Sequence, residues 1–182
     1  MKVHLKKLSQ KDIEERKANY DVFVKTKDKE MKKIIFDLDG TLALIDKRRE
    51  MSTKENGKID WDIFFDPKNI QLDEPNPNVI NMARILSDVG HTIVILSGRS
   101  KRTKAETMEW LDIHGVPFDV LKMRPMNNEF MFMKDDELKQ GWLNDLFPNK
   151  EDILCVFDDR DKVVKMWRDN GLTCFQVAEG DF

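Results

Sequence analysis

The sequence predicts an α/β fold built on a doubly wound parallel sheet of about five strands. Short apolar runs, each with the length of a strand, alternate with segments of helical periodicity. Runs this apolar are typical of parallel strands that helices cover on both faces. Acids, hydroxyls and basic residues follow several of the runs, at the sheet edge where open α/β folds bind their ligands. The runs occupy residues 33–36, 92–96, 118–121, 153–157 and 173–177.

The segments between the runs are predicted to be helices. Residues 76–90 carry apolar side chains at helical spacing and end in Gly90, a residue type that commonly follows a helix. Residues 135–147 repeat leucine and tryptophan at the same spacing, and residues 161–171 close on Gly171. This alternation of strand and helix favours parallel pairing, because each helix carries the chain back to start the next strand.

The composition is that of a single globular domain. With 182 residues and a mass of 21.4 kDa, the chain is long enough to bury a core without disulfides. No apolar run approaches the roughly 20 residues that cross a membrane, and the N-terminal segment has no signal-peptide core. We therefore expect a cytoplasmic protein with no membrane partner. The net charge of -3 argues against a protein that coats nucleic acid.

Two segments stand apart from the predicted sheet. Residues 1–30 form a charged, partly helical N-terminal extension, in which Ser9 and Asp12 predict the start of a helix. Residues 43–76 interrupt the domain of residues 31–182 after its first strand and lack regular periodicity. A loop this long beside a strand end is typical of a lid or a substrate rim. We expect it to be an irregular insert or a small cap.

The tryptophans divide between the predicted core and this insert. Trp110, Trp142 and Trp167 fall in helical patterns and are predicted to pack in the core. Trp61 and Phe64 lie in the insert, where either ring could contact a base of a nucleic acid.

Polar residues of a few chemical types gather where the predicted strands end. Because the carboxyl ends of parallel strands meet at one edge of a sheet, we expect these side chains to converge. They are Asp37, Asp39 and Thr41 after the first strand, Ser97, Gly98 and Arg99 after the second, and Asp158 and Asp159 after the fourth, with Asp135 and Lys139 in the preceding helix.

The acids predict a site for magnesium-dependent phosphoryl transfer. Carboxylates held close together repel one another unless a hard cation such as Mg²⁺ binds them, which makes Asp37, Asp39 and Asp158 candidate metal ligands. With the metal present, Asp37 can attack phosphorus and form an aspartyl-phosphate. Asp39 can donate a proton to the leaving oxygen and later accept one from the hydrolytic water.

Hydroxyl, backbone and ammonium groups complete the predicted site. Ser97 and the backbone N–H groups around Gly98 are candidates for binding phosphoryl oxygens, and Lys139 for neutralising nucleophile and phosphate. Asp135 lies four residues before Lys139 on a helix, so we expect it to hold that lysine in place. The alternative for Asp135 is a helix N-cap, and Asp159 either orients the site or caps the next helix.

Four segments, in order, resemble the signatures of the haloacid dehalogenase (HAD) superfamily of aspartate-nucleophile phosphatases. They are FDLDGTL at residues 36–42, ILSGRS at 95–100, KDDELK at 134–139 and VFDDRD at 156–161. Within that superfamily, KDDELK and the run from Phe157 to the end are similar to the 3'-phosphatase domain of phage-type polynucleotide kinase-phosphatases. The resemblance covers residues 33–182 and is poorest over residues 43–76.

The resemblance implies a role for each matching position. In it, Asp37 is the nucleophile, Asp39 the acid/base, and Asp158 a magnesium ligand with Asp159 beside it. Asp135 and Lys139 match the third signature. Arg48 falls where the family has a functional arginine after the first signature. The residues expected to bind the substrate phosphate are Thr41, Arg48, Ser97, Gly98 and Arg99.

One part of the resembling proteins has no counterpart in this sequence. Their kinase half needs a phosphate-binding G-x-x-x-x-G-K-[ST] loop, and this sequence contains none. We therefore predict no kinase activity and expect a separate protein to supply a 5'-kinase or a ligase.

Three functions remain open from the sequence. The first is a Mg²⁺-dependent phosphatase that removes 3'-phosphates from DNA or RNA ends. The second is a phosphatase with the same mechanism that acts on a mononucleotide or another small phosphate ester. The third is a noncatalytic binder of nucleic-acid ends, which the crowded acids argue against because they would repel an anion.

Overall fold

A five-stranded parallel sheet forms the centre of the fold. The computed structural model describes residue 14 and residues 31–180, so the predicted extension over residues 1–30 lies almost wholly outside the described residues. The strands lie side by side in the order β5-β4-β1-β6-β7, and every neighbouring pair is parallel. They are β1 (Lys33–Phe36), β4 (Thr92–Ser100), β5 (Val120–Arg124), β6 (Ile153–Asp158) and β7 (Cys174–Gln176).

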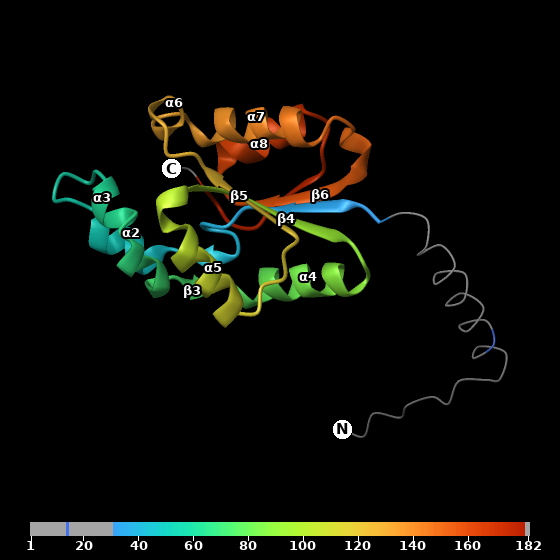
Figure 1. Ribbon diagram of the computed structural model, residues 1–182, viewed down its shortest axis with the longest axis horizontal. Coiled ribbons are helices and arrows are strands. Elements are labelled where there is room, and N and C mark those ends of the chain that lie inside the picture. Colours follow the sequence, from blue (N-terminus) through green and yellow to red (C-terminus); the bar gives the residue numbers. More distant parts are fainter. Residues whose placement is uncertain (1–13, 15–30, 181–182) are drawn as a thin grey trace, which may run out of the picture. The chain divides into compact units, whose positions relative to one another are not determined.

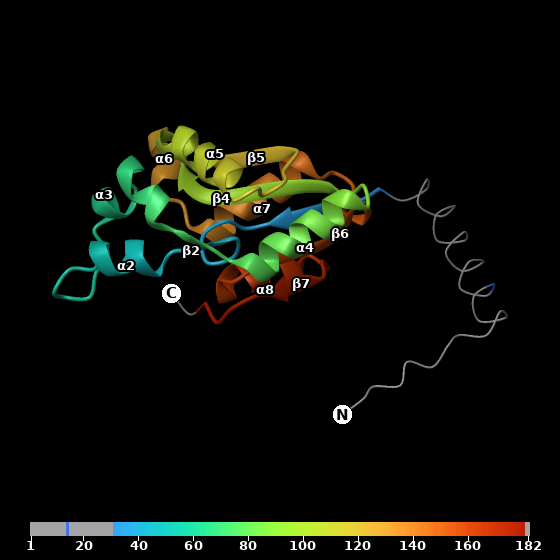
Figure 2. The same ribbon diagram turned by 90° about the horizontal axis from the view of Figure 1, so that it is seen from below.

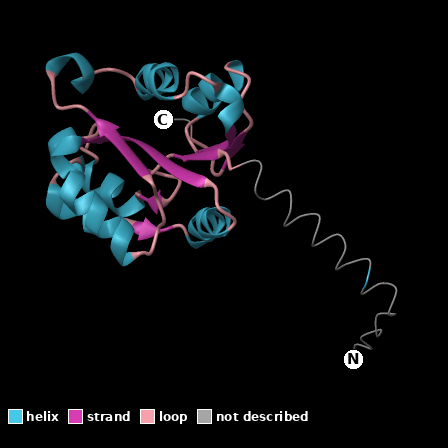
Figure 3. Cartoon of the chain, turned by 45° about the vertical axis from the view of Figure 1, so that its right-hand side comes forward, coloured by secondary structure: helices cyan, strands magenta, loops and turns pink. Residues whose placement is uncertain are grey.

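Helices cover both faces of this sheet, which confirms the predicted doubly wound architecture. Figure 1 shows α4 and α5 on one side of the strands and α7 and α8 on the other, and Figure 3 shows the same layering from a second direction. Their bounds are α4 (Pro77–Asp88), α5 (Lys104–Ile113), α7 (Asp135–Leu146) and α8 (Asp161–Asp169), and shorter elements are η2 (Lys101–Thr103), α6 (Asn128–Met131) and η3 (Lys150–Asp152).

The core consists of two apolar layers, one on each side of the sheet. Along β1, Ile34 and Phe36 pack into the layer beneath α4 and α5, whereas Ile35 packs into the layer beneath α7 and α8. This alternation follows from the pleat of a strand, which points successive side chains to opposite faces. Trp110 belongs to the first layer and Trp167 to the second, and both are buried as the sequence predicts.

The segment 43–76, which we call the insert, consists of short regular elements. The strands β2 (Ala43–Leu44) and β3 (Glu74–Pro75) close it as an antiparallel pair, and between them lie α2 (Asp46–Ser52), α3 (Trp61–Phe64) and η1 (Pro67–Leu72). We expected an irregular insert or a small cap, and the structure differs from the irregular form in having these short elements. Asp60 and Asp66 explain the difference, because their side chains accept hydrogen bonds from backbone N–H groups and start α3 and η1.

One strand is longer than the sequence predicts. We expected the second strand to end at residue 96, with Ser97, Gly98 and Arg99 after it, but β4 runs on to Ser100. The chain stays extended because β5 continues to pair with it across a register shift, with Ser97 opposite Met123 and Ser100 opposite Arg124.

Among the helices of the described residues, none combines the length and the apolar character that a membrane span requires.

A buried and an exposed isoleucine test the assignment of the core. Ile95 lies in the centre of β4 with 0% of its side chain exposed, whereas Ile85 on α4 is 57% exposed. We expect Ile95→Ala to lower the free energy of unfolding by about 2 to 5 kcal/mol, because it removes buried methyl groups and leaves a cavity. Ile85→Ala is the control and should change the free energy by about 0.5 kcal/mol or less. Urea unfolding measures both values, and equal losses would contradict the assignment.

Candidate active site

The predicted acids gather at the carboxyl ends of β1 and β6. Asp37 directly follows β1, and its backbone N–H donates to the carbonyl oxygen of Phe157 in β6 (2.9 Å). Asp158 is the last residue of β6, and Asp159 follows it. Because β1 and β6 are parallel neighbours, their ends carry these three side chains to one place.

Asp37, Asp158 and Asp159, which we call the acid triad, are all buried. One carboxylate oxygen from each lies within 4.8 Å of the others. Lys139 of α7 bridges two of them, since its Nζ donates to Asp37 Oδ1 (2.6 Å) and to Asp158 Oδ2 (2.9 Å). Trp167 also donates to Asp158 Oδ2, from Nε1 (3.1 Å). Asp158 is therefore held from two helices.

Burial and crowding alter the pKa values in this group. Burial raises the pKa of Asp37 well above its ordinary value. Lys139 opposes this increase, whereas repulsion from Asp158 and Asp159 adds to it. Burial and the neighbouring Asp158 raise the pKa of Asp159 to about 6. Burial disfavours the ammonium of Lys139, but the carboxylates of Asp158 and Asp37 outweigh it and raise the pKa of this lysine.

The charges of the acid triad suit a divalent cation. Among the described residues, the ammonium of Lys139 pairs with two of the three carboxylates, and its one charge is smaller than theirs when all are ionised. Oxygen ligands at this separation are what Mg²⁺ prefers, and its charge would remove the repulsion that burial intensifies. The residues present therefore fit a magnesium ion.

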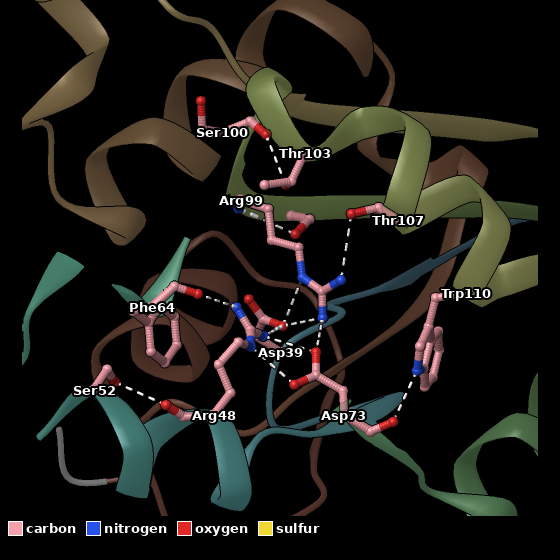
Figure 4. Close-up of polar contacts among 11 residues, drawn as sticks. Asp39, Arg48, Ser52, Phe64, Asp73, Arg99, Ser100, Thr103, Thr107 and Trp110 are labelled. Carbon is pink, nitrogen blue, oxygen red and sulfur yellow. Dashed lines mark hydrogen bonds and ion pairs between the residues drawn. The ribbon is translucent and has the colours of Figure 1, made fainter. Parts of the chain in front are cut away.

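Asp39 does not share this environment, although it lies only two residues from Asp37. Its Oδ1 accepts hydrogen bonds from Arg48 Nη2 (2.6 Å) and from Arg99 Nε (2.8 Å) and Nη2 (2.5 Å) (Figure 4). Asp39 stays a predicted metal ligand, but among the described residues the three acids close enough to hold a metal include Asp159 instead, and the Asp39 carboxylate lies between two guanidinium groups.

A second carboxylate, Asp73, completes this arrangement, and sequence reasoning missed it. Arg48 donates to it from Nε (2.8 Å) and Nη2 (2.9 Å), and Arg99 donates from Nη2 (2.5 Å). The backbone oxygen of Asp73 accepts from Trp110 Nε1 (2.9 Å), which ties the end of the insert to α5. We call Asp39, Asp73, Arg48 and Arg99 the arginine cluster, and its charges balance. Figure 4 shows its four side chains pointing toward one another.

The two carboxyls of the arginine cluster have opposite pKa shifts. Burial disfavours the ionised form of Asp39, but the charges of Arg48 and Arg99 outweigh it and hold its pKa at about 2. Burial raises the pKa of Asp73 to about 6, and the negative charge of Asp39 contributes to the increase. Asp39 is therefore the carboxyl that stays ionised in this structure at neutral and mildly acidic pH.

The predicted phosphate contacts of Arg48 and Arg99 are not supported by this geometry. Both side chains are 0% exposed and donate to carboxylates. Arg48 also donates from Nη1 to the carbonyl oxygen of Phe64 (3.3 Å), and Arg99 from Nη1 to Thr107 Oγ1 (3.3 Å). In the structure these arginines hold Asp39 in position, because a buried guanidinium needs acceptors for its N–H groups.

The remaining predicted phosphate ligands lie beside the acids. Thr41 is buried and donates from Oγ1 to Asp159 Oδ1 (3.3 Å), and Ser97 Oγ accepts from the backbone N–H of Arg99 (3.2 Å). Gly98 allows a close approach, since a Cβ atom at this position would lie 2.7 Å from Asp135 Oδ1. These contacts put the chain after β1 beside Asp159 and the end of β4 beside Asp135.

Asp135 does not hold Lys139 as we expected. Its carboxylate accepts hydrogen bonds from Arg124 Nη2 and from Arg160 Nη1 (2.5 Å), and no hydrogen bond joins it to Lys139 among the described residues. Asp135 is the first residue of α7, and its side chain reaches across to Gly98. Arg124 links this contact to β4, because its Nε donates to the carbonyl oxygen of Gly98 (3.0 Å).

Gly40 lets the chain turn sharply directly after Asp39. Its φ of +85° is a conformation that side chains rarely adopt, and a Cβ atom there would lie 2.0 Å from Asp159 Oδ2. The glycine in the first signature therefore serves both the turn and the approach of Asp159.

With this geometry established, comparison with known proteins decides the family. Residues 31–182 match the family described as the polynucleotide kinase PNKP phosphatase domain. The chain belongs to this family. It is a hydrolase domain of the HAD phosphatase type, as the four signatures predict.

Individual relatives agree with this assignment of a PNKP-type phosphatase domain. A protein of Autographa californica nuclear polyhedrosis virus, named as a bifunctional polynucleotide kinase/RNA ligase, is 31% identical over 88% of this chain and 21% of its own length. A chain of the Pnkp1/Rnl/Hen1 complex is 30% identical with a TM-score of 0.68, over 85% of this chain and 48% of that one.

A more distant structure shares the fold alone. A haloacid dehalogenase-like hydrolase from Streptococcus pneumoniae is 15% identical with a TM-score of 0.58, over 80% of this chain and 84% of that chain. The PNKP-type domain thus spans less than half the length of the viral relative and of the chain from the Pnkp1/Rnl/Hen1 complex, and most of this HAD-type hydrolase.

Neighbouring acids test the charge balance of the arginine cluster. We expect Asp73→Asn to lower the free energy of unfolding by about 3 to 5 kcal/mol, because it leaves buried guanidinium charge uncompensated. Glu74→Gln is the matched control: Glu74 is exposed and pairs with Lys47 at the surface, so its loss should change stability little. Both are measured by urea unfolding. Equal effects of the two substitutions would show that the buried charges do not stabilise the fold.

Proposed function

We propose that this domain is a magnesium-dependent phosphatase that removes 3'-phosphates from DNA or RNA ends through an aspartyl-phosphate on Asp37. The observation that carries the proposal is the acid triad, in which one ammonium faces three buried carboxylates. Such a group repels an anionic substrate unless a cation binds first. Membership of the PNKP phosphatase family supports a polynucleotide end as the substrate.

Asp37, Asp158 and Asp159 would hold the magnesium ion, which would polarise a phosphoryl oxygen and neutralise negative charge when bound. Lys139 contributes the same kind of neutralisation from the protein side, since its ammonium contacts Asp37 and Asp158. By pairing with Asp37, Lys139 also opposes the increase in the pKa of that carboxyl that its burial causes.

The first chemical step forms the covalent intermediate. A carboxylate oxygen of Asp37 attacks phosphorus, and the bond between phosphorus and the 3'-oxygen breaks. Asp39 gives a proton to the departing 3'-oxygen, leaving a 3'-hydroxyl end. Asp39 is ionised in this structure, so it must first gain this proton, and the negative charge of an incoming phosphate favours that by raising its pKa.

The second step releases the phosphate and restores the nucleophile. Asp39 is now ionised and accepts a proton from a water molecule, which attacks the phosphorus of the aspartyl-phosphate. The bond between phosphorus and Asp37 breaks, so inorganic phosphate leaves and Asp37 returns as a carboxylate. Arg48 and Arg99 suit this step, because their charges stabilise the ionised form of Asp39.

We further propose that the domain acts together with a 5'-kinase or a ligase. Two relatives support this, one named as a kinase/RNA ligase and one part of the Pnkp1/Rnl/Hen1 complex. A 3'-hydroxyl is the product expected here and is the end that a ligase joins, so the proposed reaction prepares a substrate for such a partner.

Phosphate release tests the reaction and its substrate. We expect fast release from an oligonucleotide with a 3'-phosphate, and at least roughly tenfold slower release from a 5'-phosphorylated oligonucleotide or a mononucleotide, because both lack the contacts of a 3' end. Asp37→Asn should lower the rate by roughly a thousandfold or more, because the amide is a poor nucleophile. Asp152→Asn, an exposed change in η3, is the control with unchanged rate.

The possible results of this assay have different meanings. Equal rates on all three substrates would end the proposal of an end-repair enzyme and leave a general phosphatase. Release by Asp37→Asn at the rate of the unchanged protein would exclude Asp37 as nucleophile. Release from none of the substrates, with binding of the oligonucleotide retained, would favour a noncatalytic binder.

Metal dependence is tested by activity and by stability. A chelator should abolish phosphate release and added Mg²⁺ should restore it. Mg²⁺ should also raise the melting temperature of the protein, because a ligand that binds only the folded state stabilises it. In Asp158→Asn this increase should shrink or vanish, whereas in Asp152→Asn it should persist. An increase that is equal in all three proteins would contradict binding at the acid triad.

A further inference from the structure

We infer that Trp61 is a stacking platform for a nucleobase near the 3' end of the substrate strand. The inference rests on the proposed function, because it names a binding site for the polynucleotide whose end is cut. It concerns the insert, whose exposed indole takes no part in the chemistry described above.

Trp61 differs from every other tryptophan of the chain in its exposure. Trp110, Trp142 and Trp167 are at most 4% exposed and belong to the two core layers, whereas Trp61 is 57% exposed. An indole that stabilised the fold by burial would be covered. The large exposed ring of Trp61 is therefore available to a ligand.

Neighbouring residues of the insert fix the orientation of the Trp61 ring. Trp61 begins α3, whose start is set by Asp60, and its ring stacks on Phe65 with centroids 5.7 Å apart and planes 18° apart. Phe64 meets the same ring edge-on at 5.5 Å. Two aromatic neighbours thus hold the indole in one orientation, so a base that stacks on it does not have to order it first.

The aromatic group, by which we mean Trp61, Phe64 and Phe65, is in direct contact with the arginine cluster. Phe64 is buried, its ring centroid lies 4.3 Å from Cζ of Arg48, and its carbonyl oxygen accepts from the same guanidinium. Arg48 Nη2 in turn donates to Asp39. Arg102, just beyond β4, donates to the carbonyl oxygen of Phe65 (2.9 Å). Only one aromatic ring and one guanidinium therefore separate Trp61 from the carboxylate of Asp39.

This position suits a nucleotide close to the reacting end. Stacked bases follow one another at about 3.4 Å along a strand, so a ring that a short series of contacts joins to Asp39 suits one of the first few nucleotides. Figures 1 and 2 show α2 and α3 beyond the carboxyl ends of the strands, the edge that carries the acids. An exposed aromatic face binds a base by stacking and offers no charge to a phosphate, which leaves a base as the fitting occupant.

Tryptophan fluorescence tests the contact without catalysis. In Asp37→Asn, a single-stranded oligonucleotide with a 3'-phosphate should quench the emission, because Trp61 alone among the tryptophans is exposed to it. The added substitution Trp61→Phe should remove the quenching while an independent assay, fluorescence anisotropy of a labelled oligonucleotide, still detects binding. Quenching that persists in Trp61→Phe, or binding without quenching in Asp37→Asn, would overturn the inference.

Kinetics with altered substrates tests the role of stacking. Trp61→Leu keeps apolar area but loses the aromatic face, so KM for a 3'-phosphorylated oligonucleotide should rise on the order of tenfold with kcat little changed. Trp61→Phe should recover part of the loss. Oligonucleotides with one abasic site at successive positions from the 3' end should show one position at which Trp61→Leu has no further effect. That position identifies the stacked nucleotide.

The outcomes separate this inference from the proposed function. If 3'-phosphate is released and Trp61→Leu has the KM of the unchanged protein on every substrate, the platform is excluded and the phosphatase stands. If no phosphate is released but quenching through Trp61 occurs, the platform stands and the phosphatase is excluded. A rise in KM that is equal for intact and for all abasic substrates would indicate a contact other than a base and would overturn the inference.

Discussion

Repulsion among three buried carboxylates is the constraint on which the rest of this structure depends. The parallel pairing of β1 with β6 brings Asp37 and Asp158 together, and Lys139 balances only part of their charge. Burial makes an imbalance of this kind costly, so a fold that retains it does so for a ligand or a reaction. The tight packing of Gly40 against Asp159 serves the same end, because it brings a third acid into the group.

Asp37 and Asp39 are only two residues apart in the sequence, but they lie in opposite electrostatic environments. Asp37 faces acids and one lysine, and its pKa is raised, whereas Asp39 faces two arginines, and its pKa is held at about 2. Pairs of titratable groups whose pKa values are pushed apart are typical of sites that divide nucleophile from acid/base work. The turn at Gly40 follows both acids and lets Asp159 approach the chain beside them.

How much of the site the sequence predicts depends on where its residues lie. Asp37, Asp158 and Lys139 could be predicted to meet, because parallel strand ends converge and four signatures stand in order. Asp73 could not, because it lies in an insert without periodicity and shares no motif with its partners. Charge balance is the signal that could have predicted Asp73, because two buried arginines require two carboxylates and Asp39 supplies only one. The partners of Asp135 were missed because helical spacing predicts neighbours on one helix and not contacts across to β5.

Arg48 joins the insert to the reaction site. It is fully buried and donates to Asp39, to Asp73 and to the carbonyl oxygen of Phe64, so one guanidinium contacts the acid, the end of the insert and the aromatic group of α3. A displacement of α3 must therefore stretch or break a hydrogen bond to this guanidinium, and with it change the field that keeps Asp39 ionised. In the proposed reaction the insert would therefore contribute to the acid/base step, because Arg48 connects α3 to the carboxylate of Asp39.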